Sequence, residues 1–482
     1  MNAEQRDQVR NNARYLREVR PIDPEEITEY IDGHPHPAAI RQVLREQAIP
    51  LGLLERDDGT FVPVSDDPVQ TDFSGVTELP ESIVHAVEEL LVARFGPGWP
   101  DGDAGAQLRA TIREFKSQYH ERETVEYDEL TALGYAIYHL PAYFATVQYV
   151  LSELVADALV PSNVRILDVG AGVGGPALGI DHLLDDALIE YHAVEPSAGA
   201  DVLESLLAET GRDFHATIHR QPIEEYVPEG EFDIVLFANV LSELDSPSKT
   251  VERALSWLSP DGSVVALSPA DRNTAIGLRA IEREVERRAG ATVYAPTVRL
   301  WPNETPTSTC WSFDRKPDLE IPSFQRRLDT GARTPGETEH AEDAGAPRMP
   351  GDGEFVNTDV QYAYSILRLD GTRAIEFQAS PAHAAKFKHS DRNMTKRIDC
   401  VALKLSHDLS EGTNPLFLLG DGSEQVDHFA VLTDPSALNQ PLVSAGYGEL
   451  LQFENVLVLW NDDEGAVNLV VDGETFVERI VQ

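Results

Sequence analysis

The chain contains the stretch Val164-Arg-Ile-Leu-Asp-Val-Gly-Ala-Gly-Val-Gly174, and this stretch decides the fold. An apolar run leads to Asp168 and is followed by three alternating glycines, Gly170, Gly172 and Gly174. Twenty-one residues after Gly174, a second apolar run ends in Glu195. This order is typical of a strand, a tight glycine loop and a second strand in a doubly wound α/β fold. The sequence therefore predicts a nucleoside pocket at this loop.

The glycine spacing indicates which nucleoside is bound. The spacing G-x-G-x-G after Leu-Asp favours binding of S-adenosylmethionine, whereas loops that bind dinucleotides usually have the spacing G-x-G-x-x-G. We therefore predict a Rossmann-like, class I S-adenosylmethionine-dependent methyltransferase core with this donor as its cofactor. The glycines would let the backbone approach the donor, Asp168 would orient the loop or meet the donor's amino group, and Glu195 would hold the ribose. The alternative is a core that kept this shape without binding a ligand.

Two further residues follow predicted strands of the same core. Gln221 lies after a third strand, where it or Pro222 would contact the adenine edge through side chain or main chain, although an ordinary turn is an equal alternative. Asn239 follows the fourth strand, where an acceptor meets the methyl group, so we predict that it positions the acceptor. The prolines and aromatic residue typical of exocyclic base-nitrogen methylation are missing there, and no Pro-Cys pair offers a nucleophile. Methyl transfer can proceed mainly by positioning two reactants in line, so the absence of a catalytic base does not exclude it. The sequence does not identify the acceptor atom.

The charge balance of the chain is extreme. Its 482 residues include 82 acids against 39 Lys and Arg, a formal net charge of -43. Acids spread along the whole chain indicate adaptation to high intracellular salt, because molar salt shortens the Debye length to roughly 3 Å. An acidic protein from ordinary salt is the alternative. The length predicts two to four domains.

The composition predicts no metal site and no membrane span. Cys310 and Cys400 are too few for a four-thiolate site, and His34 and His36 have no further ligand nearby in the sequence. The start of the chain has no apolar signal segment, and no apolar run approaches the roughly 20 residues that span a bilayer. We therefore predict a cytoplasmic protein. The oligomeric state is left open.

Patterning divides the chain into five regions. Helix signals followed by an Asp-Gly hairpin give a winged-helix-like module, for which nucleic-acid binding and plain packing are equally expected. Helical spacing, alternating strands and helices, a Gly/Pro/Glu-rich stretch and a series of short strands follow. The predicted regions are a winged-helix-like module at 1–70, a helical region at 78–160, the Rossmann-like domain at 161–330, a disordered linker at 331–356, and a small OB-like β-barrel at 357–482.

Two groups of basic residues stand out against the acidic background. Arg279, Arg283 and Arg287 share one helix face but alternate with glutamates, which favours a solvated, self-paired face. The stretch 386–397 leads into the predicted barrel and favours contact with an RNA phosphate backbone, with an aromatic ring to stack on a base. A counter-charge patch is the alternative. The predicted RNA-binding residues are Lys386, Phe387, Lys388, Arg392, Lys396 and Arg397.

Several blocks together resemble a known family. They are His139-Leu-Pro-Ala-Tyr143, Leu167-Asp-Val-Gly-Ala-Gly172, Val194-Glu-Pro-Ser197, Val240-Leu-Ser-Glu-Leu244, Tyr294-Ala-Pro296, Cys310-Trp-Ser-Phe313 and Gly446-Tyr-Gly-Glu-Leu450. In this order the chain resembles the mitochondrial small-ribosomal-subunit methyltransferase-like proteins of the Rsm-twenty-two type, over roughly 130–330 and more weakly over 357–455.

The resemblance implies association with the small ribosomal subunit and its rRNA, by methylation or during assembly. Many members also bind an iron–sulfur cluster through cysteines near these blocks. Here Thr297 follows Ala-Pro and only Cys310 remains, so we expect no cluster. Two alternatives stay open. One is a class I methyltransferase of a small molecule or protein, and the other is a non-enzymatic nucleic-acid-binding factor.

Overall fold

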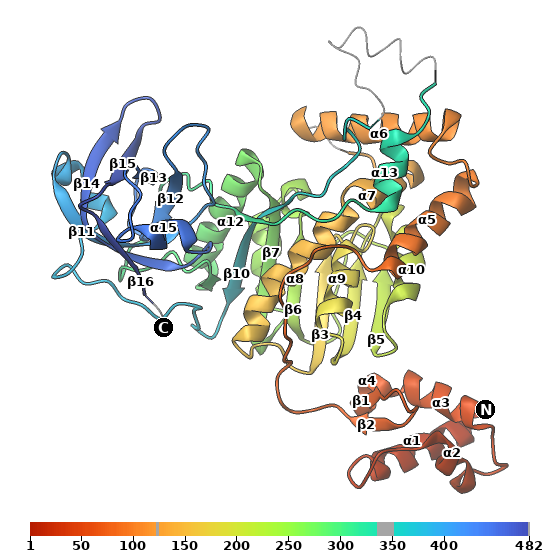
Figure 1. Ribbon diagram of the computed structural model, residues 1–482. Helices are drawn as coiled ribbons and strands as arrows, with labels where there is room; N and C mark the ends of the chain where they lie inside the picture. The colour runs from red at the N-terminus through yellow and green to blue at the C-terminus, as the bar shows by residue number, and fades with distance from the viewer. Residues whose placement is uncertain (122–124, 335–350, 481–482) are drawn as a thin grey trace. The chain divides into compact units, whose positions relative to one another are not determined.

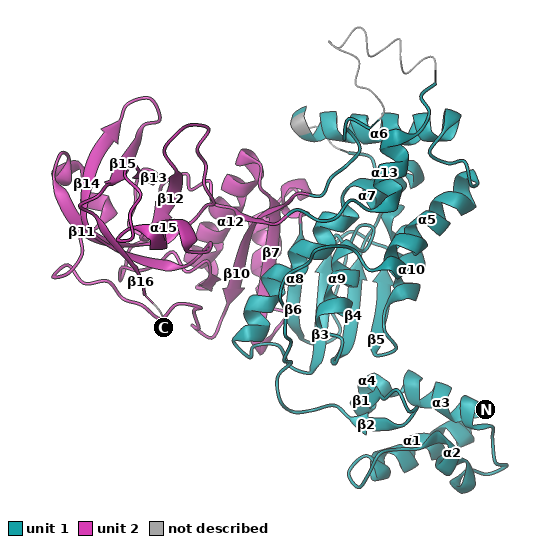
Figure 2. Cartoon of the chain, in the orientation of Figure 1, with its two compact units in different colours: residues 1–238, 318–358 teal, residues 239–317, 359–482 magenta. Residues whose placement is uncertain are grey.

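The computed structural model describes residues 1–121, 125–334 and 351–480. They form two compact units, drawn in different colours in Figure 2. Unit 1 comprises residues 1–238 and 318–358, and unit 2 comprises residues 239–317 and 359–482. Both units contain strands of an α/β core.

A parallel sheet forms the centre of unit 1. Its strand order is β5-β4-β3-β6, and register pairs such as Ile166 with Ile234 place β3 beside β6. The inner strands β3 and β6 are mostly apolar and buried, as expected where both faces of a parallel sheet are covered, whereas the edge strand β5 is only partly buried. Their bounds are β3 (Asn163–Val169), β4 (Leu188–Val194), β5 (Phe214–His219) and β6 (Phe232–Ala238). The predicted α/β core with parallel strands is confirmed.

Helices α8 (Leu140–Ala156), α9 (Gly175–Leu183) and α10 (Gly199–Leu206) belong to this core (Figure 1). α8 and α9 pack tightly at Gly179, where an added Cβ would lie 2.5 Å from the Phe144 carbonyl oxygen. Only glycine permits this approach, so the helix pair is fixed by the sequence at this point.

Helices fill the region 78–160, where helical spacing predicts them. They are α5 (Glu81–Phe95), α6 (Gly102–Glu121), α7 (Glu129–Tyr138) and α8. Unit 1 also contains α13 (Ser323–Thr330) and the short turn η2 (Leu207–Glu209). The buried side chain of Arg109 on α6 donates to the carbonyl oxygens of Pro100 (2.8 Å) and Leu328 (3.4 Å). These bonds join α13 to the helices that precede the sheet.

The predicted linker is only partly what the sequence indicated. Residues 335–350 lie outside the described part of the chain. At 351–356 the prediction of disorder was wrong, because Phe355 is fully buried and its N–H donates to the Asp329 carboxylate at 3.1 Å. One aromatic side chain supplies the apolar burial that the surrounding Gly, Asp and Glu lack.

The N-terminal segment of unit 1 is a small helical module with its own core. Its elements are α1 (Ala3–Leu16), α2 (Pro24–Ile27), η1 (Thr28–Tyr30), α3 (Pro37–Glu46), α4 (Ala48–Leu51), β1 (Leu53–Glu55) and β2 (Phe61–Pro63). The predicted hairpin is confirmed. The N–H of Glu55 donates to the carboxylate of Asp213 (3.1 Å), just before β5. The module thus contacts the amino-terminal edge of the sheet, which favours packing over nucleic-acid contact for this hairpin.

Unit 2 contributes a second group of α/β elements. They are η3 (Leu241–Glu243), α11 (Pro247–Leu255), β7 (Leu258–Pro269), α12 (Arg272–Ala289), β8 (Thr292–Ala295), β9 (Asp314–Lys316) and β10 (Val360–Arg368). β10 runs antiparallel between β7 and β8. The predicted barrel boundary at 357 was therefore wrong, since this strand belongs to the α/β part. Nearly every residue of β10 is buried, as expected of a strand covered on both faces rather than a barrel strand with a wet outer face.

The C-terminal barrel confirms the OB-like prediction. Its strands follow the order β11-β12-β13-β15-β14, and β14 pairs back with β11 to close the barrel. β13 and β15 are parallel, and the other neighbours are antiparallel. The elements are η4 (Phe387–Asn393), β11 (Arg397–Lys404), β12 (Leu416–Gly420), β13 (His428–Leu432), α15 (Gln440–Ser444), β14 (Leu450–Asn461), β15 (Ala466–Val471) and β16 (Phe476–Arg479).

Buried ion pairs fix the segment after β8 to α12, and a hydrogen bond from that segment reaches the barrel. Glu282 on α12 lies between the guanidinium groups of Arg279 and Arg299, and all three side chains are almost fully buried. The Arg283 guanidinium donates to the Ser308 carbonyl oxygen at 2.6 Å, and the Trp301 indole donates to Asp421 of the barrel at 2.7 Å. The predicted solvated face was therefore wrong at Arg279, because its helix faces β10 and not water.

Candidate cofactor site

The glycine loop follows β3 and turns the chain into α9. Gly170, Gly172 and Gly174 have φ values of 71°, 55° and 92°, a region that L side chains rarely occupy. The Gly170 N–H donates to the Val194 carbonyl oxygen at 2.8 Å, which ties the loop to the end of β4. The predicted need for glycine at these three positions follows directly from the backbone.

The glycines differ in what surrounds them. An added Cβ at Gly172 would meet only the Gly170 carbonyl oxygen, at 4.0 Å, whereas one at Gly174 would lie 2.7 Å from Leu203 Cδ1 on α10. Gly174 therefore permits helix packing, and Gly172 borders open space. A loop backbone that faces open space at a helix N-terminus is a cradle that a ligand can approach closely.

Glu195 links the loop to the end of β4. Its side chain is 7% exposed, and its two carboxylate oxygens accept hydrogen bonds from the N–H groups of Gly172 and Ser197, both at 2.8 Å. A carboxylate has about four lone-pair sites, so two remain for the hydroxyls of a ribose. The residue predicted to hold the ribose also fixes the loop beside it.

Asp168 lies under the loop at the end of β3. It is fully buried, and one carboxylate oxygen accepts a hydrogen bond from the Tyr191 hydroxyl. The other oxygen has no hydrogen-bond partner among the described residues. Burial raises the pKa of Asp168 to about 7; the Tyr191 hydrogen bond opposes this rise, and the nearby Glu195 adds to it. An unpaired buried oxygen of this kind fits a ligand that brings its own N–H donor.

The two other predicted residues lie at strand ends. Gln221 follows β5, and its N–H donates to the His219 carbonyl oxygen at 2.9 Å. Asn239 is the first residue of unit 2 and directly follows β6 in the chain. Its φ is 63°, and its N–H donates to the Leu267 carbonyl oxygen at 3.1 Å. An asparagine in this conformation holds a defined but uncommon backbone shape, as residues at functional sites often do.

An aromatic cluster next to the loop was not predicted from the sequence. It comprises Phe115, Tyr127, Tyr135, Tyr138, His139 and Tyr143, with ring centroids from 4.6 Å (Phe115 and Tyr135) to 6.2 Å apart. An added Cβ at Gly175, the first residue of α9, would lie 3.0 Å from Tyr143 Cβ. The Tyr127 carbonyl oxygen accepts from Ala198 at 3.3 Å, just beyond Glu195. Burial, with a smaller effect of Lys116, lowers the pKa of His139 to about 3, so this ring is neutral at physiological pH.

Comparisons with known proteins agree with this geometry. A family model described as "Methyltransferase domain" matches residues 143–320. Two models of the domain of unknown function DUF8157 match its N-terminal domain at 6–57 and its C-terminal domain at 388–480. The core is that of a class I S-adenosylmethionine-dependent methyltransferase.

Similar solved structures are also methyltransferases. The plantazolicin methyltransferase BpumL, in complex with SAH and a triazolic desmethylPZN analog, is 16% identical, with 42% of this chain and 66% of that chain covered and a TM-score of 0.25. A putative methyltransferase from Thermoplasma acidophilum is 13% identical, with 44% and 70% covered and a TM-score of 0.27. Among curated proteins, the hybrid PKS-NRPS synthetase iccA of Talaromyces variabilis is 28% identical over 112 residues, which are 21% of this chain and 3% of that protein.

The residues of the methyltransferase loop fit S-adenosylmethionine. When bound, this cofactor supplies a methyl group from its sulfonium to a nucleophile in the acceptor. Gly172 leaves room for the cofactor, and Glu195 offers carboxylate oxygens to its ribose hydroxyls. Asp168 offers one carboxylate oxygen, unpaired among the described residues, to a positively charged N–H group of the cofactor. In-line positioning of the two reactants would supply much of the rate, and the proton that an N–H or O–H acceptor loses on methylation would pass to water. Methyl transfer at this loop would thus depend mainly on binding and orientation.

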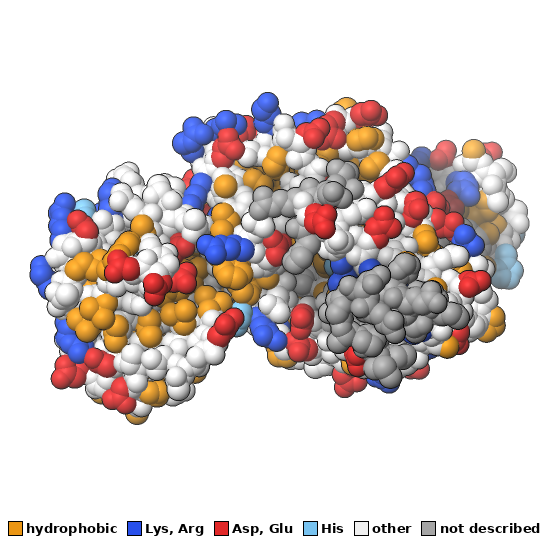
Figure 3. Space-filling model, turned by 90° about the horizontal axis from the view of Figure 1, so that it is seen from above, with side chains coloured by type: hydrophobic (Ala, Val, Ile, Leu, Met, Phe, Trp, Pro, Cys, Tyr) orange, Lys and Arg blue, Asp and Glu red, His pale blue; other side chains and the backbone are white. Residues whose placement is uncertain are grey.

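The predicted RNA-binding stretch is largely engaged within unit 2. The ammonium groups of Lys386 and Lys388 contact the Glu304 carboxylate at 3.0 and 2.9 Å, and Arg397 contacts Asp472 at 2.6 Å. The Lys396 ammonium donates to the Arg392 carbonyl oxygen at 2.7 Å. On the face that Figure 3 shows, acidic and basic side chains are interspersed. The counter-charge alternative accounts for most of these contacts.

The predicted stacking role of Phe387 was wrong. This side chain is 2% exposed, and its ring stacks on His428 with centroids 4.3 Å apart and planes 6° apart. It belongs to the interior of the barrel together with residues of all five closing strands. An aromatic residue beside lysines in a sequence indicates a surface platform, but here the Lys388 side chain is exposed while the Phe387 ring points inward.

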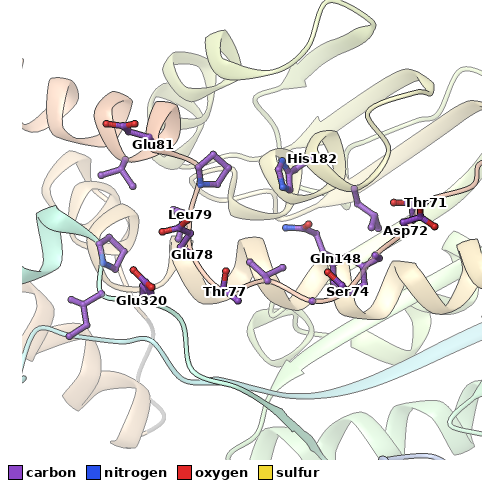
Figure 4. A pocket seen from close by; sticks show the side chains of 18 of the residues that line it. Thr71, Asp72, Ser74, Thr77, Glu78, Leu79, Glu81, Gln148, His182 and Glu320 are labelled. Carbon is purple, nitrogen blue, oxygen red and sulfur yellow. The ribbon is translucent and has the colours of Figure 1, made fainter.

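A separate cavity of about 690 Å³ lies in unit 1 (Figure 4). Residues 71–81 and 320–323 line much of it, and Val84, Gln148, His182 and Leu183 line the rest. Four carboxylates, those of Asp72, Glu78, Glu81 and Glu320, line this cavity. None of the predicted cofactor residues lines it, so it is distinct from the glycine loop.

Among the helices that the structure describes, none combines the length and the apolar character of a membrane span.

Proposed function

We propose that this methyltransferase acts on the RNA of the small ribosomal subunit. The observation that carries the proposal is the strand order of the barrel, which is that of an OB-fold. OB-folds bind oligonucleotides on strands 2 and 3 and on the loops beside them. A methyltransferase core and an oligonucleotide-binding barrel in one chain suit a nucleic-acid acceptor.

The rigid attachment of the barrel supports a guiding role. Asn239 and the barrel belong to the same compact unit, and within that unit the Trp301 indole and the Leu300 N–H both donate hydrogen bonds to Asp421 of the barrel, at 2.7 and 3.2 Å. An RNA strand held by the barrel would therefore keep a fixed position relative to Asn239, the residue proposed to position the acceptor. Positioning of this kind is what an in-line methyl transfer requires.

The paired lysines are compatible with RNA binding under this proposal. Lys386 and Lys388 share the Glu304 carboxylate, and the Lys388 side chain is the exposed one of the two, so its ion pair would contribute little, about 0–1 kcal/mol. Phosphate groups would replace Glu304 as the partner of these ammonium groups. Arg392 on η4 is exposed and is the clearest candidate for a direct phosphate contact. The surplus of acids elsewhere would fit a high-salt interior, in which repulsion from RNA is screened.

The proposal is tested with small subunits from cells that lack this chain. Purified protein and S-adenosylmethionine carrying a labelled methyl group are incubated with these particles in molar KCl, and labelled rRNA is mapped. We expect label at one or a few nucleotides with wild type and none with Glu195→Ala. Binding to the particles without label would support the alternative of an assembly factor. Neither binding nor label would overturn the proposal.

The aromatic cluster of unit 1 favours one second candidate, a small planar acceptor. Stacked rings such as His139 and Tyr143, with centroids 5.4 Å apart, lie beside the glycine loop and suit flat organic molecules. Label in an RNA-free extract that is lost in Tyr143→Ala but kept in Arg392→Ala would favour this acceptor over rRNA.

A further inference from the structure

Tyr191 contacts the cofactor site through its hydroxyl, which bonds Asp168, and the roles described so far do not include it. It lies on β4, which runs parallel to β3, and its side chain is fully buried. Its ring packs against Phe214 with centroids 5.1 Å apart, and its hydroxyl donates to Asp168. A tyrosine hydroxyl buried in a sheet needs a partner, but that partner need not be an acid at a ligand site.

The hydrogen bond divides the Asp168 carboxylate into two unlike oxygens. One is held by Tyr191, and the other is buried without a partner among the described residues. A carboxylate fixed at one oxygen cannot rotate freely, so the second oxygen keeps a single direction. Leaving it unpaired costs free energy that a ligand donor would recover.

The same bond acts on the charge of Asp168. The titratable groups that act on this carboxyl are Tyr191 from β4 and Glu195 after it. Burial and Glu195 favour the neutral acid, whereas the hydroxyl of Tyr191 favours the carboxylate. A neutral acid would attract a cation poorly, so the hydroxyl matters for any cationic ligand.

We propose that Tyr191 is a positioning residue that keeps Asp168 ionised and directed toward the α-ammonium group of S-adenosylmethionine. The inference rests on the cofactor site described above. The Tyr191 hydroxyl thus acts on the amino-acid end of S-adenosylmethionine only through Asp168, without touching the ligand. The nucleoside end is held by Glu195 and the glycine loop independently of Tyr191.

The test compares two ligands and two variants by calorimetry. S-adenosylmethionine carries the ammonium group, whereas 5′-methylthioadenosine has the same nucleoside without the amino acid. Tyr191→Phe should weaken S-adenosylmethionine binding about tenfold or more, the usual effect of losing a hydrogen bond to a charged group, and leave 5′-methylthioadenosine within twofold. Tyr149→Phe is the matched control, because its hydroxyl bonds the Val76 N–H, away from the loop.

The pH profile separates this role from a packing defect. In Tyr191→Phe the pKa of Asp168 rises further, so the loss of affinity should be largest near pH 6 and shrink toward about pH 7.5, above which the ligand's own amino group begins to lose its proton. Equal losses for both ligands at every pH would overturn the proposal.

If Tyr191→Phe fails to fold, Asp168→Asn should show the same selectivity between the ligands, and a loss for both would overturn it. Wild type that binds neither ligand would instead refute the cofactor site itself.

Discussion

Glu195 accepts a hydrogen bond from the Gly172 N–H at 2.8 Å, so the acid at the end of β4 and the glycine at the end of β3 form one unit. Sequence motifs treat these residues as two separate contacts to a nucleoside. In the folded chain they support each other, because the carboxylate orders the loop whose open side admits the ligand. Binding of the cofactor and local order of the loop should therefore change together.

Two glycine substitutions should separate binding from packing. Gly172→Ala adds a methyl group to open space at a φ of 55°, so we expect a loss of about 1–2 kcal/mol in stability and at least a tenfold loss of S-adenosylmethionine affinity. Gly179→Ala would force Phe144 away from a 2.5 Å approach and cost about 1–3 kcal/mol, with near-normal affinity in the folded protein. Chemical denaturation and calorimetry measure both, and equal affinities would contradict the cradle role of Gly172.

Glu282 should be a main determinant of unit 2 stability. Glu282→Gln leaves Arg279 and Arg299 buried without their shared carboxylate, so we expect a loss of about 3–5 kcal/mol. Glu284→Gln changes a half-buried glutamate of the same helix that pairs with the exposed Arg288, and it should cost less, about 0–1 kcal/mol. Urea unfolding of the two variants compares them, and similar midpoints would show that the buried pairs contribute little.

The same residue predicts a loss of stability in acid. Burial alone would raise the pKa of Glu282, but Arg279 and then Arg299 outweigh it and hold the pKa below its usual value. The stabilisation is therefore complete above the unfolded pKa of about 4.3 and is lost as the pH falls through the lower folded value. Thermal unfolding from pH 6 to 3 should show a steeper decline for wild type than for Glu282→Gln. Parallel declines would count against the ion pairs.

Phe387 and Arg392 should have opposite effects despite lying five residues apart. Phe387→Ala removes a ring from the barrel interior and should cost about 3–5 kcal/mol of stability. Arg392→Ala should leave stability within about 0.5 kcal/mol and weaken RNA binding with a smaller salt dependence. Denaturation and RNA titration at several KCl concentrations test both. Unchanged RNA affinity in Arg392→Ala would remove it from the proposed interface.

Salt should stabilise the chain if its acidity is an adaptation to high salt. A net charge of -43 repels itself over about 10 Å at 0.1 M salt but only about 3 Å at 1 M. We expect the unfolding temperature to rise steeply between 0.1 and 1 M KCl and more slowly beyond. A flat profile would favour the alternative of an acidic protein from ordinary salt.

The cofactor loop was predictable because its signal is local. Acid, glycines and second acid stand at strand ends, and their roles depend on backbone conformation within a few residues. The OB-like barrel was predictable for a similar reason, since short alternating strands with turns between them limit the choice of fold.

Other features depend on contacts that spacing does not encode. β10 looks like any strand, and only its partners β7 and β8 assign it to the α/β part. Phe387 lies among lysines in the sequence but inside the barrel in space. The Tyr191 hydroxyl reaches Asp168 from 23 residues away because two parallel strands lie side by side. No local pattern marks such a tyrosine as part of a site.

Binding of S-adenosylmethionine tests the cofactor site directly. Calorimetry in molar KCl would compare wild type with Glu195→Ala, and with Glu204→Ala as a control for loss of an exposed acid paired with Arg220. We predict one-to-one binding by wild type and Glu204→Ala, and at least a tenfold weaker affinity for Glu195→Ala. Folded wild-type protein that binds no S-adenosylmethionine, or binds it equally well without Glu195, would contradict the assignment of the glycine loop as the cofactor site.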